Sequence, residues 1–109
     1  MPAEFKVLTI TEGQCQFEFV NAKGEQVILS TKFPDKEKAV KAIQDVRVGS
    51  MMSQFIAKGK TTQGEFYFIV KDTNGTELAK SISYNSEMQF DNALHNFRDN
   101  ACIAEISYC

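Results

Sequence analysis

The stretch that decides the fold runs from Glu65 to Arg98 and has the sequence EFYFIVKDTNGTELAKSISYNSEMQFDNALHNFR. It begins with an alternating aromatic and aliphatic run, which is typical of a strand, and the Asn74-Gly75 pair that follows is the strongest short hairpin signal in the chain. The next run, Leu78 to Tyr84, is therefore predicted to return as a second strand. Ser86 then caps a helix, and Gln89 completes a capping box. The apolar residues of this helix recur at i, i+3, i+4 and i+7 and form its buried stripe: Phe90, Ala93, Leu94 and Phe97.

The same order of strand, turn, strand and helix occurs once before, from Gln16 to Arg47. A shift of 51 residues matches turn, cap and helix positions, pairing Thr11 with Thr62, Gly13 with Gly64, Gly24 with Gly75, Ser30 with Ser81, Phe33 with Tyr84, Asp35 with Ser86, Ala42 with Ala93, Ile43 with Leu94 and Arg47 with Arg98. In the first strand of the hairpin the predicted shift is 49, so that Phe17 matches Phe66 and Phe19 matches Phe68. The chain is therefore predicted to be a single domain made of two repeats, at about residues 4–55 and 55–108.

The remaining elements follow from alternation and from helix-end signals. Strands are predicted at residues 4–11, 15–20, 25–31, 51–60 and 102–108. Asp35 is predicted to be the N-cap of the first helix, and Gly49 is predicted to end that helix. Its buried stripe is Ala39, Ile43 and Val46. Asn100 is the predicted end of the second helix.

Two repeats are too few, and a period of about 50 residues is too long, for an open solenoid. The units are instead expected to pack together around a pseudo-twofold axis. Each unit has the order strand, strand, strand, helix, strand, and the strand after the first helix continues into the second repeat. An α+β fold is therefore predicted.

Four packing and turn features appear in both repeats. They are Phe17-x-Phe19, Gly24, Ser30 to Phe33 and Ile43-x-x-Val46-Arg47, and then Phe66-x-Phe68, Gly75, Ser81 to Tyr84 and Leu94-x-x-Phe97-Arg98. In these features the chain, over about residues 5 to 108, resembles the YegP-like proteins. The resemblance implies one continuous, mostly antiparallel sheet with two helices, in which the C-terminal strands are exchanged between the halves. The chain departs from the pattern at Lys80, where the first repeat has Leu29. The YegP-like family is uncharacterised, so the resemblance implies no active site.

Composition and charge favour an ordinary globular protein. The net charge of −2 creates no strong field that would attract nucleic acid or anionic lipid. No apolar run approaches the roughly 20 residues that a membrane helix needs. The first ten residues lack the basic start and apolar stretch of a secretory signal. We therefore expect a soluble cytoplasmic protein, which is a monomer or a weak homodimer.

The three cysteines, Cys15, Cys102 and Cys109, are an odd number and form no CxxC motif. This pattern disfavours a disulfide framework and a structural zinc site. Cys15 and Cys102 are predicted to be small core residues within strands, and a bridge between them would require neighbouring strands. Cys109 is predicted to be an exposed thiol.

No group of residues in the sequence forms a catalytic motif. His95 stands at the edge of the apolar stripe of the second helix, where it is either a general base or metal ligand, or a partly solvated histidine. The run from Lys58 to Thr62 is similar in sequence to a phosphate-binding loop, but no helix is predicted to follow it. The carboxylates are scattered over helix ends and outer faces. We therefore predict no catalytic residue, no metal, no cofactor and no enzymatic activity.

Basic residues are the strongest candidates for partner contacts. Residues 1–60 carry nine Lys and Arg against seven Asp and Glu, whereas residues 61–109 carry three against seven. The candidate contacts to an anion or partner are Lys36, Lys38, Lys41, Arg47 and Arg98. The lysines are either an anion-binding face or an ordinary solvated helix surface. The two arginines are either helix-dipole partners or a symmetric anion site.

Three hypotheses of function follow. The first is a non-enzymatic domain that binds a protein or a small ligand through the sheet or its edges. The second is weak binding of nucleic acid or another anionic ligand through the basic face of the first helix. The third is an enzyme with a site across the pseudo-twofold axis. Tyr67 and Tyr84 are the aromatic residues expected outside the core.

Overall fold

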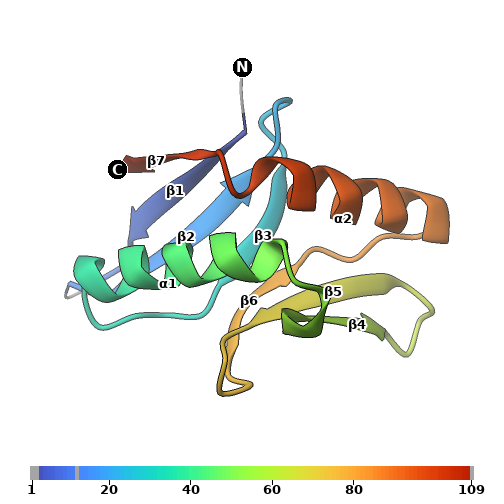
Figure 1. Ribbon diagram of the computed structural model, residues 1–109, viewed down its shortest axis with the longest axis horizontal. Coiled ribbons are helices and arrows are strands. Elements are labelled where there is room, and N and C mark those ends of the chain that lie inside the picture. Colours follow the sequence, from blue (N-terminus) through green and yellow to red (C-terminus); the bar gives the residue numbers. More distant parts are fainter. Residues whose placement is uncertain (1–2, 12, 109) are drawn as a thin grey trace.

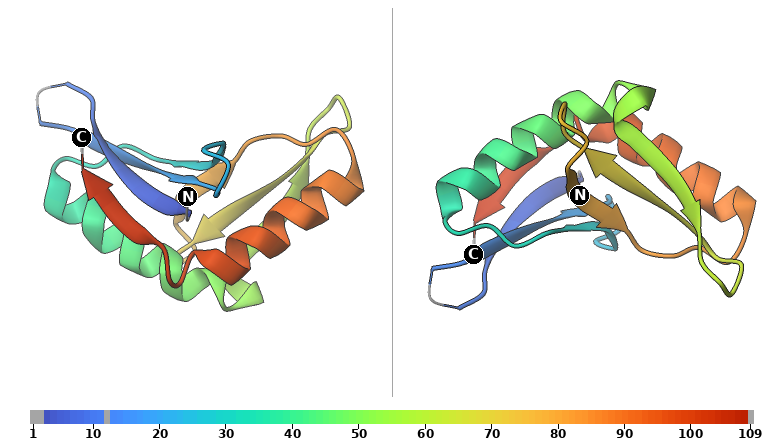
Figure 2. Two further views of the ribbon diagram at one scale, coloured as in Figure 1. Left: turned by 90° about the horizontal axis from the view of Figure 1, so that it is seen from above. Right: turned by 90° about the horizontal axis from the view of Figure 1, so that it is seen from below.

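The computed structural model describes residues 3–11 and 13–108 of the chain. Within these residues the fold is a seven-stranded sheet with the strand order β4-β5-β6-β3-β2-β1-β7, and two helices cover one of its faces (Figure 1, Figure 2). The elements are β1 Glu4–Thr9, β2 Cys15–Val20, β3 Gln26–Ser30, α1 Lys36–Ser50, the short 3-10 helix η1 Ser53–Phe55, β4 Ile56–Lys60, β5 Phe66–Lys71, β6 Glu77–Ser81, α2 Glu87–Asn100 and β7 Glu105–Tyr108. The predicted α+β class is confirmed. No helix in the described part of the chain is long and apolar enough to cross a membrane.

The sheet is mixed. β7 pairs with β1 in parallel, with Phe5 beside Ile106, and the other strand pairings are antiparallel. The last described strand therefore lies beside the first. The two hairpins meet in the middle of the sheet, where β3 pairs with β6 and Leu29 lies opposite Lys80.

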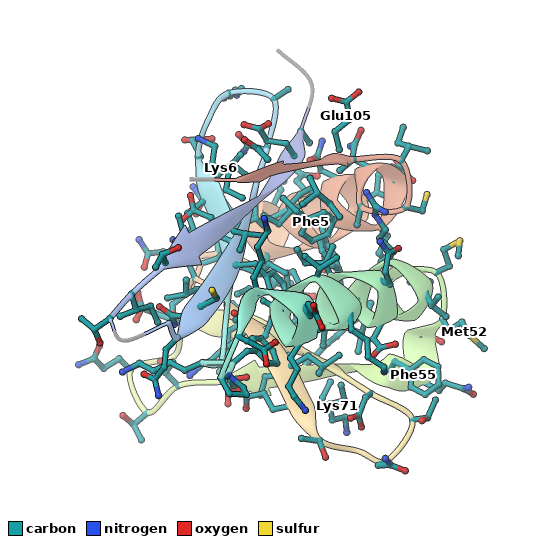
Figure 3. All side chains as sticks on the ribbon, turned by 90° about the vertical axis from the view of Figure 1, so that its left-hand side faces the viewer. Phe5, Lys6, Met52, Phe55, Lys71 and Glu105 are labelled. Atoms are coloured by element: carbon teal, nitrogen blue, oxygen red, sulfur yellow. The ribbon has the colours of Figure 1, made fainter. Side chains whose placement is uncertain are left out.

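The core lies between the sheet and the helices, because strand residues alternate between the two faces of the sheet. Phe5 points toward the helices and is fully buried, whereas its neighbour Lys6 points to the opposite face (Figure 3). Phe97 of α2 joins the two hairpins, since its ring centroid lies 5.3 Å from that of Phe19 and 5.3 Å from that of Phe68. Aromatic pairs at this separation stabilise a core by about 0.5–1.5 kcal/mol beyond the burial of their area.

Both helices begin where the sequence predicts. The side chain of Asp35 accepts a hydrogen bond from the Lys38 amide at 2.8 Å, and that of Ser86 accepts one from the Gln89 amide at 3.1 Å. The predicted buried residues of α1 are buried, and so are those of α2 except Ala93, which is partly exposed. α2 ends at Asn100, as predicted.

The prediction that Gly49 ends α1 is wrong. The helix continues to Ser50, and Met51 is its C-cap. A Cβ atom on Gly49 would lie 3.3 Å from Cγ1 of Val70 and 3.4 Å from Cβ of Phe55. Gly49 therefore lets the helix approach β5 closely, and it does not serve as a left-handed helix stop.

Several predicted strands are shorter in the structure: β1 ends at Thr9, β3 spans Gln26–Ser30 and β6 ends at Ser81. Two further strands begin later than predicted. The 51–60 segment contains η1 before β4 begins at Ile56, and the 102–108 segment begins with a turn, so that β7 starts at Glu105. Cys102 lies in this turn and is exposed, so its predicted core position is wrong, whereas Cys15 is buried as predicted. Both are free thiols, so they form no bridge. Cys109 lies outside the described residues.

Hydrogen bonds correct the predicted shift of 49 residues in the first hairpin strand. The Ser30 hydroxyl accepts a bond from the Phe17 amide at 2.8 Å, and the Ser81 hydroxyl accepts one from the Phe68 amide at 2.9 Å. Phe17 therefore corresponds to Phe68 and not to Phe66, and the shift of 51 holds in this strand too. The Asn74-Gly75 hairpin is confirmed; the Gly75 amide donates to the Asp72 carbonyl at 3.0 Å, and Gly75 has a φ of 83°.

Candidate functional site

The lysines predicted as partner contacts lie on the solvent side of α1. Lys36, Lys38 and Lys41 are exposed, and they share this surface with carboxylates. The ammonium of Lys41 lies 3.5 Å from a carboxylate oxygen of Asp45, one helical turn further on. An exposed pair of this kind contributes little to stability, about 0.3–0.5 kcal/mol. It nevertheless reduces the positive charge that this face presents.

The two arginines point toward protein backbone. Arg47 donates from Nη2 to the Ala104 carbonyl and from Nη1 to Gln44 at 3.1 Å, and its guanidinium carbon lies 5.9 Å from the Phe5 ring centroid. Arg98 donates from Nε to the Ser50 carbonyl at 3.1 Å, at the C-terminus of α1. Each arginine therefore binds the chain that leaves the other helix. The structure does not bring the five predicted contact residues into one site.

His95 is on the surface. Its side chain is 80% exposed, and Nε2 lies 3.1 Å from a carboxylate oxygen of Asp99. Within residues 3–11 and 13–108 no group of three or more His, Cys, Asp or Glu side chains is placed to hold a metal ion.

The Lys58 to Thr62 run forms the end of β4 and the beginning of the turn after it. A Cβ atom on Gly59 would lie 2.4 Å from Cζ of Tyr67, so the glycine makes room for the Tyr67 ring on the neighbouring strand. The ammonium of Lys60 lies 5.2 Å from the Phe66 ring centroid. Packing against the aromatic residues of β5 therefore accounts for this run.

A groove of about 350 Å³ lies between the β2–β3 hairpin, the segment after β6, and α2. We call it the Tyr84 groove. Its lining residues are Asn21, Ala22, Lys23, Glu25, Gln26, Val27, Ile82, Tyr84, Asn92, Ala93 and Asn96. Sequence reasoning missed it because these three segments are distant along the chain. The available signal was Asn92 and Asn96, two neutral polar residues at i and i+4 on one face of a helix.

The lining of the Tyr84 groove carries one cation and one anion, Lys23 and Glu25, and its other polar groups are neutral. Burial, and to a smaller extent the negative charge of Glu25, raises the pKa of the Tyr84 phenol above its usual value of 10.0. The phenol therefore stays protonated at neutral pH and can donate a hydrogen bond. Within the described residues, the side-chain amides of Asn92 and Asn96 make no hydrogen bond to protein. They are available to a ligand.

A second groove, of about 200 Å³, lies between α1, η1 and the β5–β6 hairpin. It is lined by Lys41, Asp45, Val48, Phe55, Lys71, Asp72, Thr73 and Asn74. The shift of 51 residues places Lys41 and Asp45 at the positions of Asn92 and Asn96. In this groove the two helix residues bind each other, whereas in the Tyr84 groove they are unengaged. The Tyr84 groove is therefore the stronger candidate for a ligand site.

No family model matches the chain. The UPF0339 protein PA0329 of Pseudomonas aeruginosa is 30% identical over 87 residues, which is 80% of this chain and 79% of that protein. The chain belongs to the UPF0339 family. Two solution NMR structures share its fold at 22% identity. UPF0339 protein SO3888 from Shewanella oneidensis has a TM-score of 0.92 over 99% of this chain and 92% of its own. The protein yegP from E. coli, described as of unknown function, has a TM-score of 0.90 over 99% and 93%.

These relatives confirm the resemblance to the YegP-like family that the sequence indicated. They are uncharacterised, so membership of the UPF0339 family assigns no activity or ligand to this chain.

Proposed function

We propose that this UPF0339 protein is a non-enzymatic binding domain whose ligand site is the Tyr84 groove. The observation that carries the proposal is the convergence of a protonated phenol with the unengaged amides of Asn92 and Asn96. An amide offers both a donor and an acceptor, and the phenol adds a further donor. The ligand is therefore a small uncharged molecule that offers both donors and acceptors, such as a sugar or a short amide.

The direction of the Tyr84 pKa shift supports binding over catalysis. A tyrosine that acts as a base or nucleophile needs a lowered pKa, because its anion must be populated near neutral pH. Burial raises the pKa of Tyr84 instead. The other obvious proton-transfer group, His95, is largely solvated and is not one of the residues that line the groove.

Titration of ¹⁵N-labelled protein with monosaccharides and short uncharged amides tests the proposal. We expect amide shifts at residues 21–26 and 92–96, and their loss in the double variant Asn92→Ala/Asn96→Ala. The double variant Lys41→Ala/Asp45→Ala is the matched control, because it alters the corresponding positions of the other helix. Absence of shifts at about 10 mM for every compound would refute this site.

We propose further that the chain is one domain of two repeats, about residues 4–55 and 55–108, related by a pseudo-twofold axis. The matching serine hydrogen bonds, the matching grooves and the reciprocal arginine contacts support this proposal. The pairing of β7 with β1 supports an exchange of C-terminal strands between the halves. β4 then serves both as the strand after α1 and as the first strand of the second repeat.

The alternative function is weak binding of nucleic acid or another anionic ligand through Lys36, Lys38, Lys41 and Arg47. Three exposed lysines on one helix support this alternative. The hydrogen bonds of Arg47 to Gln44 and to the Ala104 carbonyl count against a role for Arg47 in anion binding, because they engage its guanidinium. Gel-shift titration with RNA and DNA at low salt tests it, and no shift at tens of micromolar would end it.

The proposed location is the cytoplasm, and the proposed state is a monomer or weak homodimer. Sedimentation over a range of protein concentrations tests the oligomeric state.

A further inference from the structure

β4 is one end of the sheet. Within the described residues no strand pairs with its outer side, and of the outer groups only the Ile56 amide is engaged, because it donates to the Ser53 carbonyl of η1. The Thr61 amide donates to the Glu65 carbonyl at 2.8 Å, so this pair is hydrogen-bonded. Hydrogen-bonded and non-hydrogen-bonded pairs alternate in an antiparallel ladder. The pairs of Ile56, Lys58 and Lys60 with β5 are therefore non-hydrogen-bonded. The amide and carbonyl groups of these three residues point away from β5.

β1 shows which kind of strand an edge of this type accepts. The Ile10 amide donates to the Gln14 carbonyl at 2.8 Å, so by the same alternation Phe5 and Val7 direct their backbone groups away from β2. There they meet β7, which runs parallel to β1. The shift of 51 residues places Ile56 at the position of Phe5 and Lys58 at that of Val7. β4 therefore offers the outward groups of β1 without a covering strand, from the Ile56 carbonyl onward, because the Ile56 amide is bonded to Ser53.

We propose that the edge of β4 binds an extended segment of a partner protein as a parallel strand, with an apolar residue beside Ile56 and an acidic residue two positions later beside Lys58. This surface shares no residue with the Tyr84 groove.

The contacts of β7 define the apolar position. Ile106 lies beside Phe5 and packs against the core while remaining partly exposed. Ile56 is also partly buried and packs against the core. An apolar side chain beside Ile56 would therefore extend the core in the way that Ile106 extends it at the other edge.

Charge defines the acidic position. Val7 is buried, whereas Lys58, at the corresponding place, is exposed and followed by the exposed Lys60. Lysines on an edge discourage pairing with uncharged strands and favour a strand with carboxylates. Two β4 strands from two copies of this chain would bring these lysines together, which like-charge repulsion opposes. The partner is therefore an acidic segment of another protein.

The test uses a capped peptide, Ser-Ala-Ile-Ser-Glu-Ser-Glu, titrated into ¹⁵N-labelled full-length protein. We expect amide shifts centred on Ile56 to Lys60. The double variant Lys58→Glu/Lys60→Glu should bind this peptide at least about tenfold more weakly and should bind the version with Lys in place of Glu. The control Lys6→Glu/Lys80→Glu makes the same charge change on the open face of the sheet and should bind like the wild type.

Three results would overturn the proposal. The first is the absence of shifts at millimolar peptide in a wild-type protein with the native spectrum. The second is a set of shifts confined to residues outside β4. The third is a concentration-dependent shift at β4 without peptide, which would show that a second copy occupies the edge.

Discussion

At the scale of single residues, the core depends on a few large aromatic side chains in contact across elements. Phe68 is fully buried, and its ring centroid lies 5.3 Å from that of Phe97 and 6.2 Å from that of Phe90. These contacts join β5 to two turns of α2. Close packing means that the neighbours can only partly fill the space that a deleted ring would leave.

We therefore expect Phe68→Ala to lower the free energy of unfolding by about 3–5 kcal/mol. Urea denaturation measures this loss. Ile103→Ala is the control, because Ile103 is 76% exposed and its truncation should change the stability by no more than about 0.5 kcal/mol. Equal midpoints for Phe68→Ala and the wild type would show that Phe68 does not face the core.

Tyr84 makes stability depend on pH in the alkaline range. Its pKa is raised above 10.0 in the folded protein, so the unfolded chain loses the phenolic proton first. The unfolded state then binds fewer protons than the folded state, and the free energy of unfolding falls as pH rises. Well below pH 10.0 both states hold the proton, and this stability is fully present.

Urea unfolding at a series of pH values around and above 10 should therefore show a shallower decline for Tyr84→Phe than for the wild type. Glu25→Gln should keep most of the wild-type slope, because burial is the larger cause of the shift. Parallel declines in the wild type and Tyr84→Phe would contradict the raised pKa.

At the scale of elements, local signals predicted where the helices begin, whereas tertiary contacts decided where α1 ends. Asp35 and Ser86 satisfy free amides of their own first turns, which is a local interaction that the sequence contains. Gly49 stays helical because α1 packs closely on β5, and that contact is remote in sequence. The Tyr84 groove escaped prediction for the same reason, since its walls come from distant segments.

Strands β2 and β5 each donate a backbone hydrogen bond to a buried serine of the following strand, Ser30 of β3 and Ser81 of β6. Ser30 accepts a hydrogen bond from the Phe17 amide and donates to the Thr31 carbonyl at 2.7 Å, and Ser81 does the same with Phe68 and Ile82, donating at 2.8 Å. Removal of either hydroxyl leaves a buried amide without a partner. If the halves are true repeats, the two serine substitutions should lower the free energy of unfolding by equal amounts.

We expect Ser30→Ala and Ser81→Ala each to cost about 1–3 kcal/mol of stability, measured by urea denaturation. The exposed Ser53 provides the matched substitution, Ser53→Ala, which should be close to neutral. A large loss in one half and none in the other would contradict equivalent roles for the two serines.

At the scale of the whole molecule, the two halves are held together by reciprocal contacts as well as by the shared sheet. Arg47, at the end of α1, binds the Ala104 carbonyl just before β7, and Arg98, at the end of α2, binds the Ser50 carbonyl at the end of α1. The sequence placed both arginines at helix ends, but it could not show that each one reaches the other helix's exit. A cation beside the last carbonyls of a helix is favourable, because it complements the negative end of the helix dipole.

Loss of either arginine should therefore loosen the junction of the halves. A hydrogen bond from a charged donor to a partly buried carbonyl contributes about 1.5–3 kcal/mol, so we expect Arg47→Met and Arg98→Met to lose stability of that order. Hydrogen exchange should locate the effect. In Arg47→Met the β7 amides should exchange faster, because the segment before β7 is released from α1. In Arg98→Met the amides at the end of α1 should exchange faster.

Lys38→Met is the control for this experiment, because it removes a charge from an exposed position of α1. It should change neither the free energy of unfolding nor the hydrogen exchange of β7 and the end of α1. Phosphate separates the structural role from an anion site. If the arginines hold the halves together, inorganic phosphate should stabilise the wild type and both arginine variants to the same small extent. Stabilisation of the wild type alone would show that Arg47 and Arg98 bind anions, since only a site that contains the guanidinium groups would respond in that way.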